Sequence, residues 1–181
     1  MSKDAPEVDL YRKGVHLLMD HITTESCKEA IEFILKQGYE LSNRQTKLQL
    51  LVCSEGGDMN AAFALIDIIR GSKIDIDTVG LGIIGSAGLL IFMSGTNRTL
   101  TPNTSILSHQ WSWGAHGKEH ELFAQLKEYE LTTKRMIAHY KKCTKLKEKE
   151  IRQYLLPPED VWLSANDAKK LGICDTVRSG Y

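Results

Sequence analysis

The stretch TVGLGIIGSAGLLIFMSGTN, residues 78–97, decides the fold that we expect for this chain. It carries no charged residue, and its two halves differ in composition. Residues 79–84 are β-branched and spaced by glycines, which is typical of a buried strand, whereas residues 89–93 are typical of the start of a buried helix. The Ser86 hydroxyl lies at the junction between the predicted strand and the predicted helix. There it lies at a helix N-terminus, where N–H groups and the helix dipole favour developing negative charge, so Ser86 is the candidate nucleophile.

Two other interpretations of this stretch remain open. Twenty uncharged residues are long enough for a membrane helix, but five glycines, together with serine, threonine and asparagine, interrupt the apolar run. The stretch can also be a buried strand, turn and helix in which Ser86 is present only because it is small. Residues elsewhere in the chain help to decide whether Ser86 is a small packing residue or a nucleophile.

Composition narrows the functional classes. The chain has 181 residues, which suits one domain, and its 23 Lys and Arg balance its 23 Asp and Glu. A net charge of zero argues against a nucleic-acid or anionic-membrane partner, since both require a basic excess. The polar, acidic start MSKDAPEVD is not expected to be a signal peptide. The four cysteines form no C-x-x-C pair and no Cys/His cluster, so we expect reduced thiols in the cytoplasm, no metal site and no cofactor.

Strand and helix signals alternate along the chain. We expect residues 1–13 to be a short, loose arm and residues 14–181 to form one α/β domain. Strands are predicted over residues 14–19, 47–53 and 76–84, followed in turn by helices over residues 24–37, 58–70 and 86–93, with Gly38 ending the first helix. This βαβ rhythm predicts a parallel sheet with crossover helices. Shorter strands are predicted at 98–100, 104–108 and 173–177, and shorter helices at 148–156 and 164–171.

A long helix is predicted over residues 118–142. Its apolar stripe recurs every three or four residues, at Leu122, Leu126, Tyr129, Thr133, Met136, Ile137 and Tyr140. A helix of six to seven turns is too long to lie entirely on a domain of this size. We therefore expect part of it to project and to meet another copy of the chain, which makes the protein a homo-oligomer.

The candidate catalytic set is Ser86, His109 and Asp160. A serine hydroxyl needs a base within hydrogen-bond reach, and the base needs a carboxylate that fixes its tautomer and stabilises the imidazolium. His109 follows an apolar strand and precedes a glycine-containing loop, so it is the histidine that we expect to be held rigidly. Of the others, His16 is placed in a strand, and His116, His120 and His139 are expected to face solvent. The α/β-hydrolase motif G-x-S-x-G is absent, because residue 84 is isoleucine.

Gly56 and Gly57 supply a candidate oxyanion hole. Two glycines between a strand and a helix allow the backbone to adopt positive φ and to aim N–H groups at a ligand. The expected donors are the N–H groups of Gly57 and of Ala87, the residue after the nucleophile. The alternative is an ordinary tight turn.

Four motifs give the chain a resemblance to the family of Clp protease proteolytic subunits, ClpP, over residues 14–177. SEGG at 54–57 resembles the family's Ser-Pro-Gly-Gly, and GIIGSAG at 82–88 resembles its Gly-x-x-Ala-Ser-Met-Gly nucleophile turn. LSHQ at 107–110 resembles its Met-Ile-His-Gln, and DVWLSA at 160–165 resembles its Asp-x-aromatic-Leu-Ser/Thr-Ala. The four motifs occur in the family's order.

The resemblance implies a ClpP/crotonase-like ββα spiral in which the helix over residues 118–142 is a projecting handle. It also implies serine endopeptidase activity on unfolded polypeptides and short peptides, inside a chamber formed by two stacked rings. A separate AAA+ unfoldase would use ATP, because this chain has no G-x-x-x-x-G-K-[ST] motif and so carries no ATPase site of its own.

The chain departs from the family pattern at three positions. Glu55 replaces a proline and places a carboxylate near the site, which is expected to disfavour acidic substrates. Ala87 replaces a methionine, so the backbone donor is kept but a pocket-lining side chain is lost. Trp111 replaces the proline after His-Gln. The N-terminal arm is also short, from which we expect weak coupling to an unfoldase or a non-standard partner.

Three rival interpretations stay open. The chain can be a catalytically impaired structural ring subunit, which activity on a short peptide would exclude. It can be another hydrolase of the same fold, signal-peptide-peptidase-like or crotonase-like, and crotonase chemistry would not need the Ser–His–Asp set. It can also be a non-enzymatic scaffold that uses the amphipathic helix. Labelling of Ser86 by a fluorophosphonate discriminates among them.

Overall fold

A mixed sheet forms the centre of the computed structural model, which describes residues 9–39 and 45–179. Five strands run parallel in the order β1-β2-β3-β4-β7, namely Val15–Leu18, Lys47–Ser54, Asp75–Gly85, Arg98–Leu100 and Thr176–Val177. β5 (Ser105–Ser108) also pairs with β3, and β6 (Val161–Ser164) pairs antiparallel with β5. The predicted α/β class with a parallel sheet is confirmed.

The long strand β3 changes its partner midway. Its residues 78–80 pair with β4, whereas residues 83–85 pair with β5. Gly82 lies between the two paired segments with a φ of 58°, a left-handed conformation that glycine adopts without steric cost. The strand can therefore turn from one neighbour to the other. This turn carries the end of β3 to the end of β5, where the candidate site lies.

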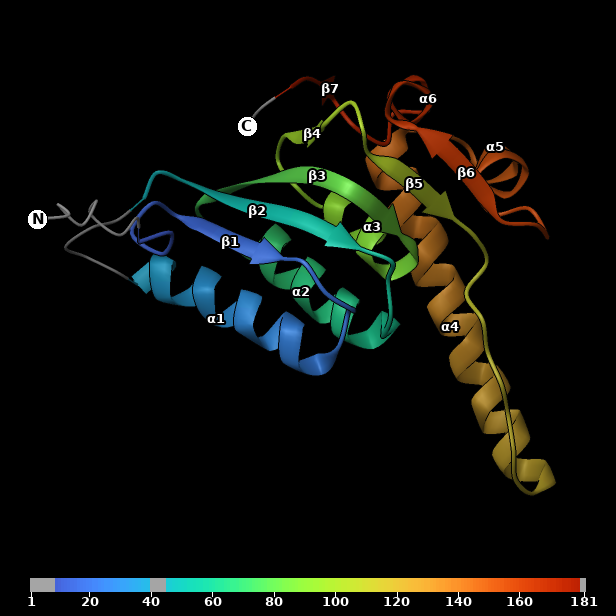
Figure 1. Cartoon of the computed structure of the whole chain (residues 1–181). Helices are drawn as coiled ribbons and strands as arrows, with labels where there is room; N and C mark the ends of the chain where they lie inside the picture. The colour runs from blue at the N-terminus through green and yellow to red at the C-terminus, as the bar shows by residue number, and fades with distance from the viewer. Residues whose placement is uncertain (1–8, 40–44, 180–181) are drawn as a thin grey trace, which may run out of the picture.

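The helices cover the sheet and its end. α1 (Thr24–Tyr39) and α2 (Met59–Gly71) lie side by side beneath β1 and β2 (Figure 1). α3 (Ser86–Met93) is the predicted buried helix, and every residue after Ser86 in it is buried. α5 (Glu148–Tyr154) and α6 (Ala165–Lys170) lie near β6 (Figure 1). No helix among the described residues is both long and apolar enough to cross a bilayer.

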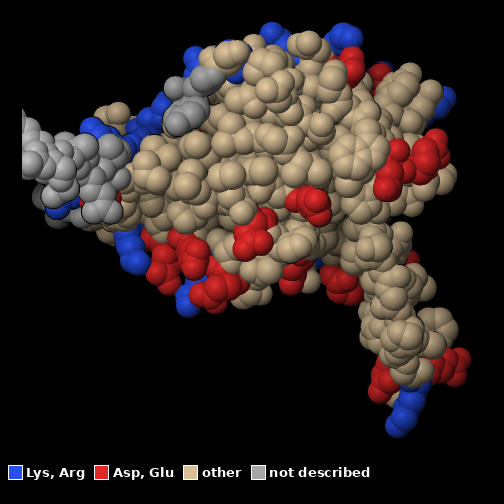
Figure 2. Space-filling view, in the orientation of Figure 1, with Lys and Arg blue, Asp and Glu red and all other residues tan. Residues whose placement is uncertain are grey.

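α4 (Glu119–Thr144) is half buried and half projecting. Met136, Ile137 and Tyr140 in its second half are buried in the core. Its first half extends away from the sheet with the preceding segment running beside it (Figure 1), and its end stands clear of the domain with charged side chains gathered at the tip (Figure 2). Leu122, Phe123 and Leu126 are 39%, 65% and 43% exposed there. The prediction that this helix projects is confirmed.

Several sequence-based boundaries were wrong, each for a local reason. α1 runs through Gly38 to Tyr39, because Gly38 does not adopt the left-handed conformation of a helix stop. The last strand starts at Thr176 instead of Ile173, because the Ile173 N–H donates to the Ala168 carbonyl at 2.9 Å and completes the end of α6. Of the predicted arm, residues 1–8 lie outside the described residues, while residues 9–13 form a turn fixed to α1 by the Gln37 amide, which donates to the Tyr11 carbonyl at 2.6 Å.

His139 was wrongly expected to face solvent. It is 3% exposed, on the buried side of α4, with Nδ1 lying 2.8 Å from a nitrogen of Arg70 at the end of α2. Burial, together with the neighbouring Arg70 charge, lowers the pKa of His139 to about 3. The imidazole is therefore neutral and accepts from the guanidinium, which joins α2 to α4. The helical period at 136–140 places His139 beside apolar residues, but only the position of α2 supplies its partner.

A buried hydroxyl anchors the end of β5. The Ser108 hydroxyl donates to the Leu155 carbonyl at 2.6 Å, so the Tyr140 hydroxyl, 2.8 Å away, must donate to Ser108. Burial raises the pKa of Tyr140 to about 12, which keeps the phenol protonated as a donor. The strand that ends just before His109 is thereby fixed to α4 and to the segment after α5.

Replacing Ser108 by alanine should destabilise the fold. The change leaves the Tyr140 hydroxyl and the Leu155 carbonyl buried without their partner, at a typical cost of about 1–3 kcal/mol. Urea unfolding should show a lower midpoint with an unchanged slope. Tyr140→Phe is the control, because Ser108 then keeps its bond to Leu155 and the loss should be smaller. A Ser108→Ala midpoint equal to that of the wild type would contradict this account of β5.

Candidate active site

Three chain segments converge at the carboxyl ends of β2, β3 and β5. Ser86 comes directly after β3, His109 directly after β5, and Gly56–Gly57 directly after Ser54 and Glu55 at the end of β2. β3 and β5 are parallel neighbours with Gly85 opposite Leu107, so the two strands deliver Ser86 and His109 to the same edge of the sheet. Ligands of parallel α/β sheets bind at this edge.

Ser86 has an unusual backbone conformation. Its φ is +51°, one of two non-glycine residues with positive φ in the described part of the chain. Strand β3 ends at Gly85 and helix α3 begins at Ser86, so the direction of the chain changes at a single residue. A left-handed non-glycine residue costs about 1–3 kcal/mol and is typical of functional sites. The sharp strand-to-helix turn is also the way in which hydrolases of another fold expose a nucleophilic serine.

The glycine pair after β2 packs directly on this turn. A Cβ atom on Gly56 would lie 2.6 Å from the Ser86 Cβ and 3.1 Å from the Ala87 nitrogen, so no side chain fits there. The pair is held from its other side by Ile22, whose N–H donates to the Gly56 carbonyl and whose carbonyl accepts from the Asp58 N–H. Among the described residues no acceptor takes the Gly57 N–H. This donor is left for a ligand.

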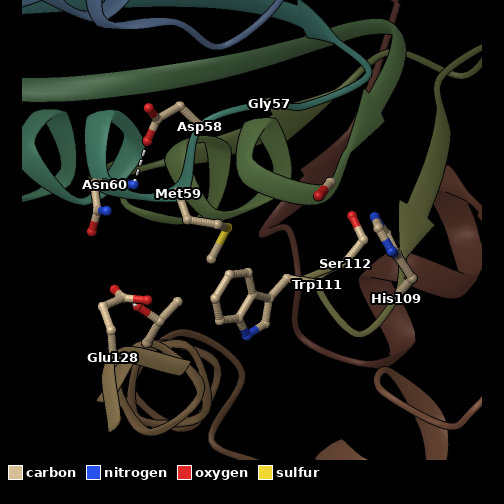
Figure 3. A pocket seen from close by; sticks show the side chains of 10 residues that line it. Gly57, Asp58, Met59, Asn60, His109, Trp111, Ser112 and Glu128 are labelled. Atoms are coloured by element: carbon tan, nitrogen blue, oxygen red, sulfur yellow. Dashed lines mark hydrogen bonds between the residues drawn. The ribbon is translucent and has the colours of Figure 1, made fainter. Parts of the chain in front are cut away.

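A cavity of about 260 Å³ opens beside Ser86. It is lined by Gly57, Asp58, Met59, Asn60, Ser86, His109, Trp111, Ser112, Glu128 and Thr132. His109 and Ser112 lie at one side in Figure 3, and Asp58, Asn60 and Glu128 lie at the other. The cavity is smaller than a typical drug-sized pocket of about 300–1,000 Å³. It is therefore suited to one side chain of a larger ligand.

Trp111 forms a wall of this cavity and is fixed to α4. Its indole ring stacks on Tyr129, with ring centroids 5.0 Å apart and an interplanar angle of 21°. Its Nε1–H donates to the Thr133 hydroxyl at 3.1 Å. The segment after His109 therefore runs along α4 instead of folding back over the sheet.

The structure brings some of the predicted site residues together and leaves one apart. Ser86, His109 and Gly57 line the same cavity, and Ala87 is buried directly behind Ser86. Continuing the β5–β6 register, in which Ser108 lies opposite Val161, by one pair sets Asp160 opposite His109. Asp160 is nevertheless exposed and does not line the cavity. Of the hydrogen bonds between described residues, none joins Ser86 to His109 or His109 to Asp160. Catalytic hydrogen bonds are often long without substrate and tighten when it binds.

Sequence reasoning missed two carboxylates in the cavity. Asp58 is recognisable as the N-cap of α2, accepting from the Asn60 and Ala61 N–H groups, but its position in the cavity depends on the β2–α2 turn. Glu128 lies on α4, far along the chain, and no sequence signal links it to Ser86. Glu55, which was expected to bring negative charge to the site, is exposed and is not among the lining residues. Within the described ranges, no group of three or more His, Cys, Asp or Glu residues lies close enough to hold a metal ion.

Comparisons with known proteins agree with this architecture. A solved structure of a ClpP1 mutant from Listeria monocytogenes superposes with a TM-score of 0.82, covering 94% of each chain at 24% identity, which shows a shared fold. The ATP-dependent Clp protease proteolytic subunit 1 of Corynebacterium jeikeium is 27% identical over 97% of this chain and 92% of its own length. The corresponding subunit 1 of Chlamydia trachomatis is 30% identical over 83% of this chain and 80% of its own length.

A further relative, the ATP-dependent Clp protease proteolytic subunit of Deinococcus radiodurans, is 28% identical over 75% of this chain and 66% of its own length. The sequence profile that describes the Clp protease family matches residues 4–180, nearly the whole chain. This chain therefore belongs to the Clp protease family.

Proposed function

We propose that this chain is a serine endopeptidase that cleaves unfolded polypeptides and short peptides through Ser86, His109 and Asp160. The observation that carries the proposal is the left-handed Ser86 at the β3–α3 turn, packed under Gly56 and sharing a cavity with His109. A small residue needed only for packing has no reason to adopt a costly backbone conformation. A nucleophile that must be presented at a helix N-terminus has a reason to adopt such a conformation.

The proposed reaction follows from these positions. His109 accepts the Ser86 proton as Ser86 Oγ attacks the scissile carbonyl carbon, and Asp160 orients the imidazole and stabilises its charged form. The N–H groups of Gly57 and Ala87 donate to the oxyanion of the tetrahedral intermediate. His109 then protonates the leaving amine, and the peptide C–N bond breaks. Water, deprotonated by His109, hydrolyses the acyl-enzyme and restores Ser86.

The proposal extends to assembly and partners. We expect a homo-oligomer of two stacked rings, in which α4 meets another copy and the Ser86 sites face an enclosed chamber. Family membership and the exposed apolar side chains of α4 support this expectation. A separate AAA+ unfoldase would deliver folded substrates and use the ATP, in the cytoplasm, while short peptides would enter unaided. The names of the relatives, which specify ATP-dependent proteolysis, support a partner of this class.

One observation favours a second candidate, a catalytically impaired ring subunit of the same family. Asp160 is exposed, and no hydrogen bond between described residues connects Ser86, His109 and Asp160. Peptidase activity of the purified chain separates the two candidates.

Ser86→Ala should abolish peptide hydrolysis while the fold and assembly stay intact. Loss of the nucleophile costs about 10⁶ in turnover in a well-studied serine protease. The measurement is hydrolysis of a fluorogenic peptide, together with mass spectrometry of the protein after treatment with a fluorophosphonate, which should modify the wild type at Ser86. A variant that keeps more than a few per cent of wild-type activity would refute the assignment.

Asp160→Asn should lower turnover by up to roughly 10⁴ without unfolding the protein, because the asparagine amide cannot hold His109 in the required tautomer. Asp167→Asn is the matched control. Asp167, in the first turn of α6, accepts from the Ser164 hydroxyl at 2.7 Å and pairs with Lys170 at the end of that helix. The hydrogen bonds from Lys170 and Ser164 hold the pKa of Asp167 below its usual range. Near-normal activity of Asp160→Asn together with an inactive Asp167→Asn would move the carboxylate role to Asp167.

Charging the projecting half of α4 should weaken assembly. Phe123→Glu combined with Leu126→Glu removes apolar contact area and places repelling charges in the expected interface, so sedimentation should show smaller species than the wild type. Glu130→Gln, on the same helix, is the control and should leave assembly unchanged. A wild-type protein that sediments as a monomer at micromolar concentration with full peptidase activity would overturn the oligomer proposal.

A further inference from the structure

The cavity beside Ser86 has an asymmetric charge. Two of its ten lining residues, Asp58 and Glu128, carry carboxylates, and none of the ten is lysine or arginine. Two carboxylates on a surface are ordinarily solvated and do not by themselves indicate a binding site. Asp58 and Glu128 are exposed, but they line the same open cavity as the candidate nucleophile, so a substrate side chain that enters from Ser86 can meet them.

Each carboxylate keeps one oxygen free of protein contacts. Asp58 uses Oδ1 alone to cap α2, accepting from Asn60 N–H at 2.7 Å and from Ala61 N–H at 3.0 Å. Glu128 uses Oε1 alone, accepting from the Thr132 hydroxyl at 2.7 Å and from Arg135 at 3.2 Å. Among the described residues no donor reaches Asp58 Oδ2 or Glu128 Oε2. The hydrogen bonds to Oδ1 and Oε1 fix both carboxylates in position and leave one acceptor oxygen on each for a ligand.

Two large apolar side chains, those of Met59 and Trp111, line the cavity between Ser86 and the carboxylates. The Met59 side chain points toward the Trp111 ring, and the pair lies between His109 on one side and Asp58 and Glu128 on the other (Figure 3). A lysine or arginine side chain has the matching pattern, an apolar stem with a cationic end. An aromatic face attracts a cation, and a thioether adapts to an irregular stem.

Arg135 forms an ion pair with Glu128, and none of the ion pairs between described residues involves Asp58. The Nη2 atom of Arg135 lies 3.2 Å from Glu128 Oε1 and 3.2 Å from Asn60 Oδ1, and its guanidinium carbon lies 4.9 Å from the Phe63 ring centroid. Arg135 is exposed and is not among the residues that line the cavity. One positive charge against two negative charges leaves the pocket with a net negative charge.

We propose that this cavity is the subsite for the substrate residue whose carbonyl Ser86 attacks, and that Asp58 and Glu128 make it selective for lysine or arginine. The inference rests on the proposed peptidase function and adds its substrate class. The stem of the side chain lies between Met59 and Trp111, and its cationic end meets the free oxygens of the two carboxylates. A glutamate side chain in the same place meets like charge and is rejected.

The test uses fluorogenic peptides that differ only in the residue before the scissile bond, which is arginine, its neutral isostere citrulline, or glutamate. The wild type should cleave the arginine peptide with a kcat/KM about tenfold or more above that of the citrulline peptide, the ratio typical of a hydrogen bond to a charged group. The glutamate peptide should be the slowest. In Asp58→Asn combined with Glu128→Gln the ratio of arginine to citrulline cleavage should fall to near one.

The variants are chosen to preserve the fold. Asparagine caps a helix as well as aspartate does, and glutamine still accepts from Thr132 and Arg135. Glu130→Gln, a charge loss on the same helix outside the cavity, should keep the wild-type ratio. If the double variant unfolds by circular dichroism, the wild type alone still tests the proposal, because the ratio should fall as salt screens the charges from about 0.1 M to 1 M.

The outcomes separate the two proposals. Fluorophosphonate labelling of Ser86 and cleavage of the citrulline peptide, with equal cleavage of the arginine peptide, would overturn the subsite and leave the peptidase standing. A double variant that folds and retains the preference would also overturn it. Absence of labelling and of all cleavage would instead refute the peptidase, and the subsite with it.

Discussion

The candidate site depends on one close backbone contact, that of Gly56 with the turn at Ser86. A Cβ at residue 56 would lie 2.6 Å from the Ser86 Cβ, so the contact exists only because residue 56 has no side chain. The contact also fixes where Gly57 presents its N–H, since Ile22 holds the flanking peptide groups. The strained Ser86, with φ at +51°, is thereby held against the glycine turn that follows β2. Loss of this contact would relax the strained backbone at Ser86 and would also displace the Gly57 N–H.

α4 joins the cavity to the projecting part of the molecule. Glu128 and Thr132 line the cavity at the point where the helix passes from its exposed half to its buried half. Trp111 stacks on Tyr129 within the same stretch, and Arg135 connects Glu128 to Asn60 at the start of α2. The wall of the cavity is therefore built from an element whose other end is exposed. The site and the proposed assembly would share this helix.

Much of the fold was predictable because its signals are local. The uncharged stretch at 78–97 predicted the β3–α3 turn, and the structure places α3 at Ser86–Met93 as expected. The βαβ rhythm predicted a parallel sheet, and a parallel sheet sends the ends of its strands to one edge. Ser86, His109 and Gly57 could therefore be proposed as site residues from residue types at strand ends, and they line one cavity. The wrong boundaries depended on the backbone conformation of Gly38 and on the hydrogen bond of the Ile173 N–H, neither of which a sequence pattern records.

The sequence by itself determined the order of the elements, the family and the residues that end β2, β3 and β5, because periodicity, glycine placement and motif spacing are properties of the chain. Only the tertiary structure decided that β3 exchanges β4 for β5 at Gly82, that His139 is buried against Arg70, and that Trp111 stacks on Tyr129. It also decided that Asp58 and Glu128, seventy residues apart, line one cavity with Ser86. The reason is physical: such contacts form when separate elements pack, and the free energy of packing depends on shape and burial that no single segment contains.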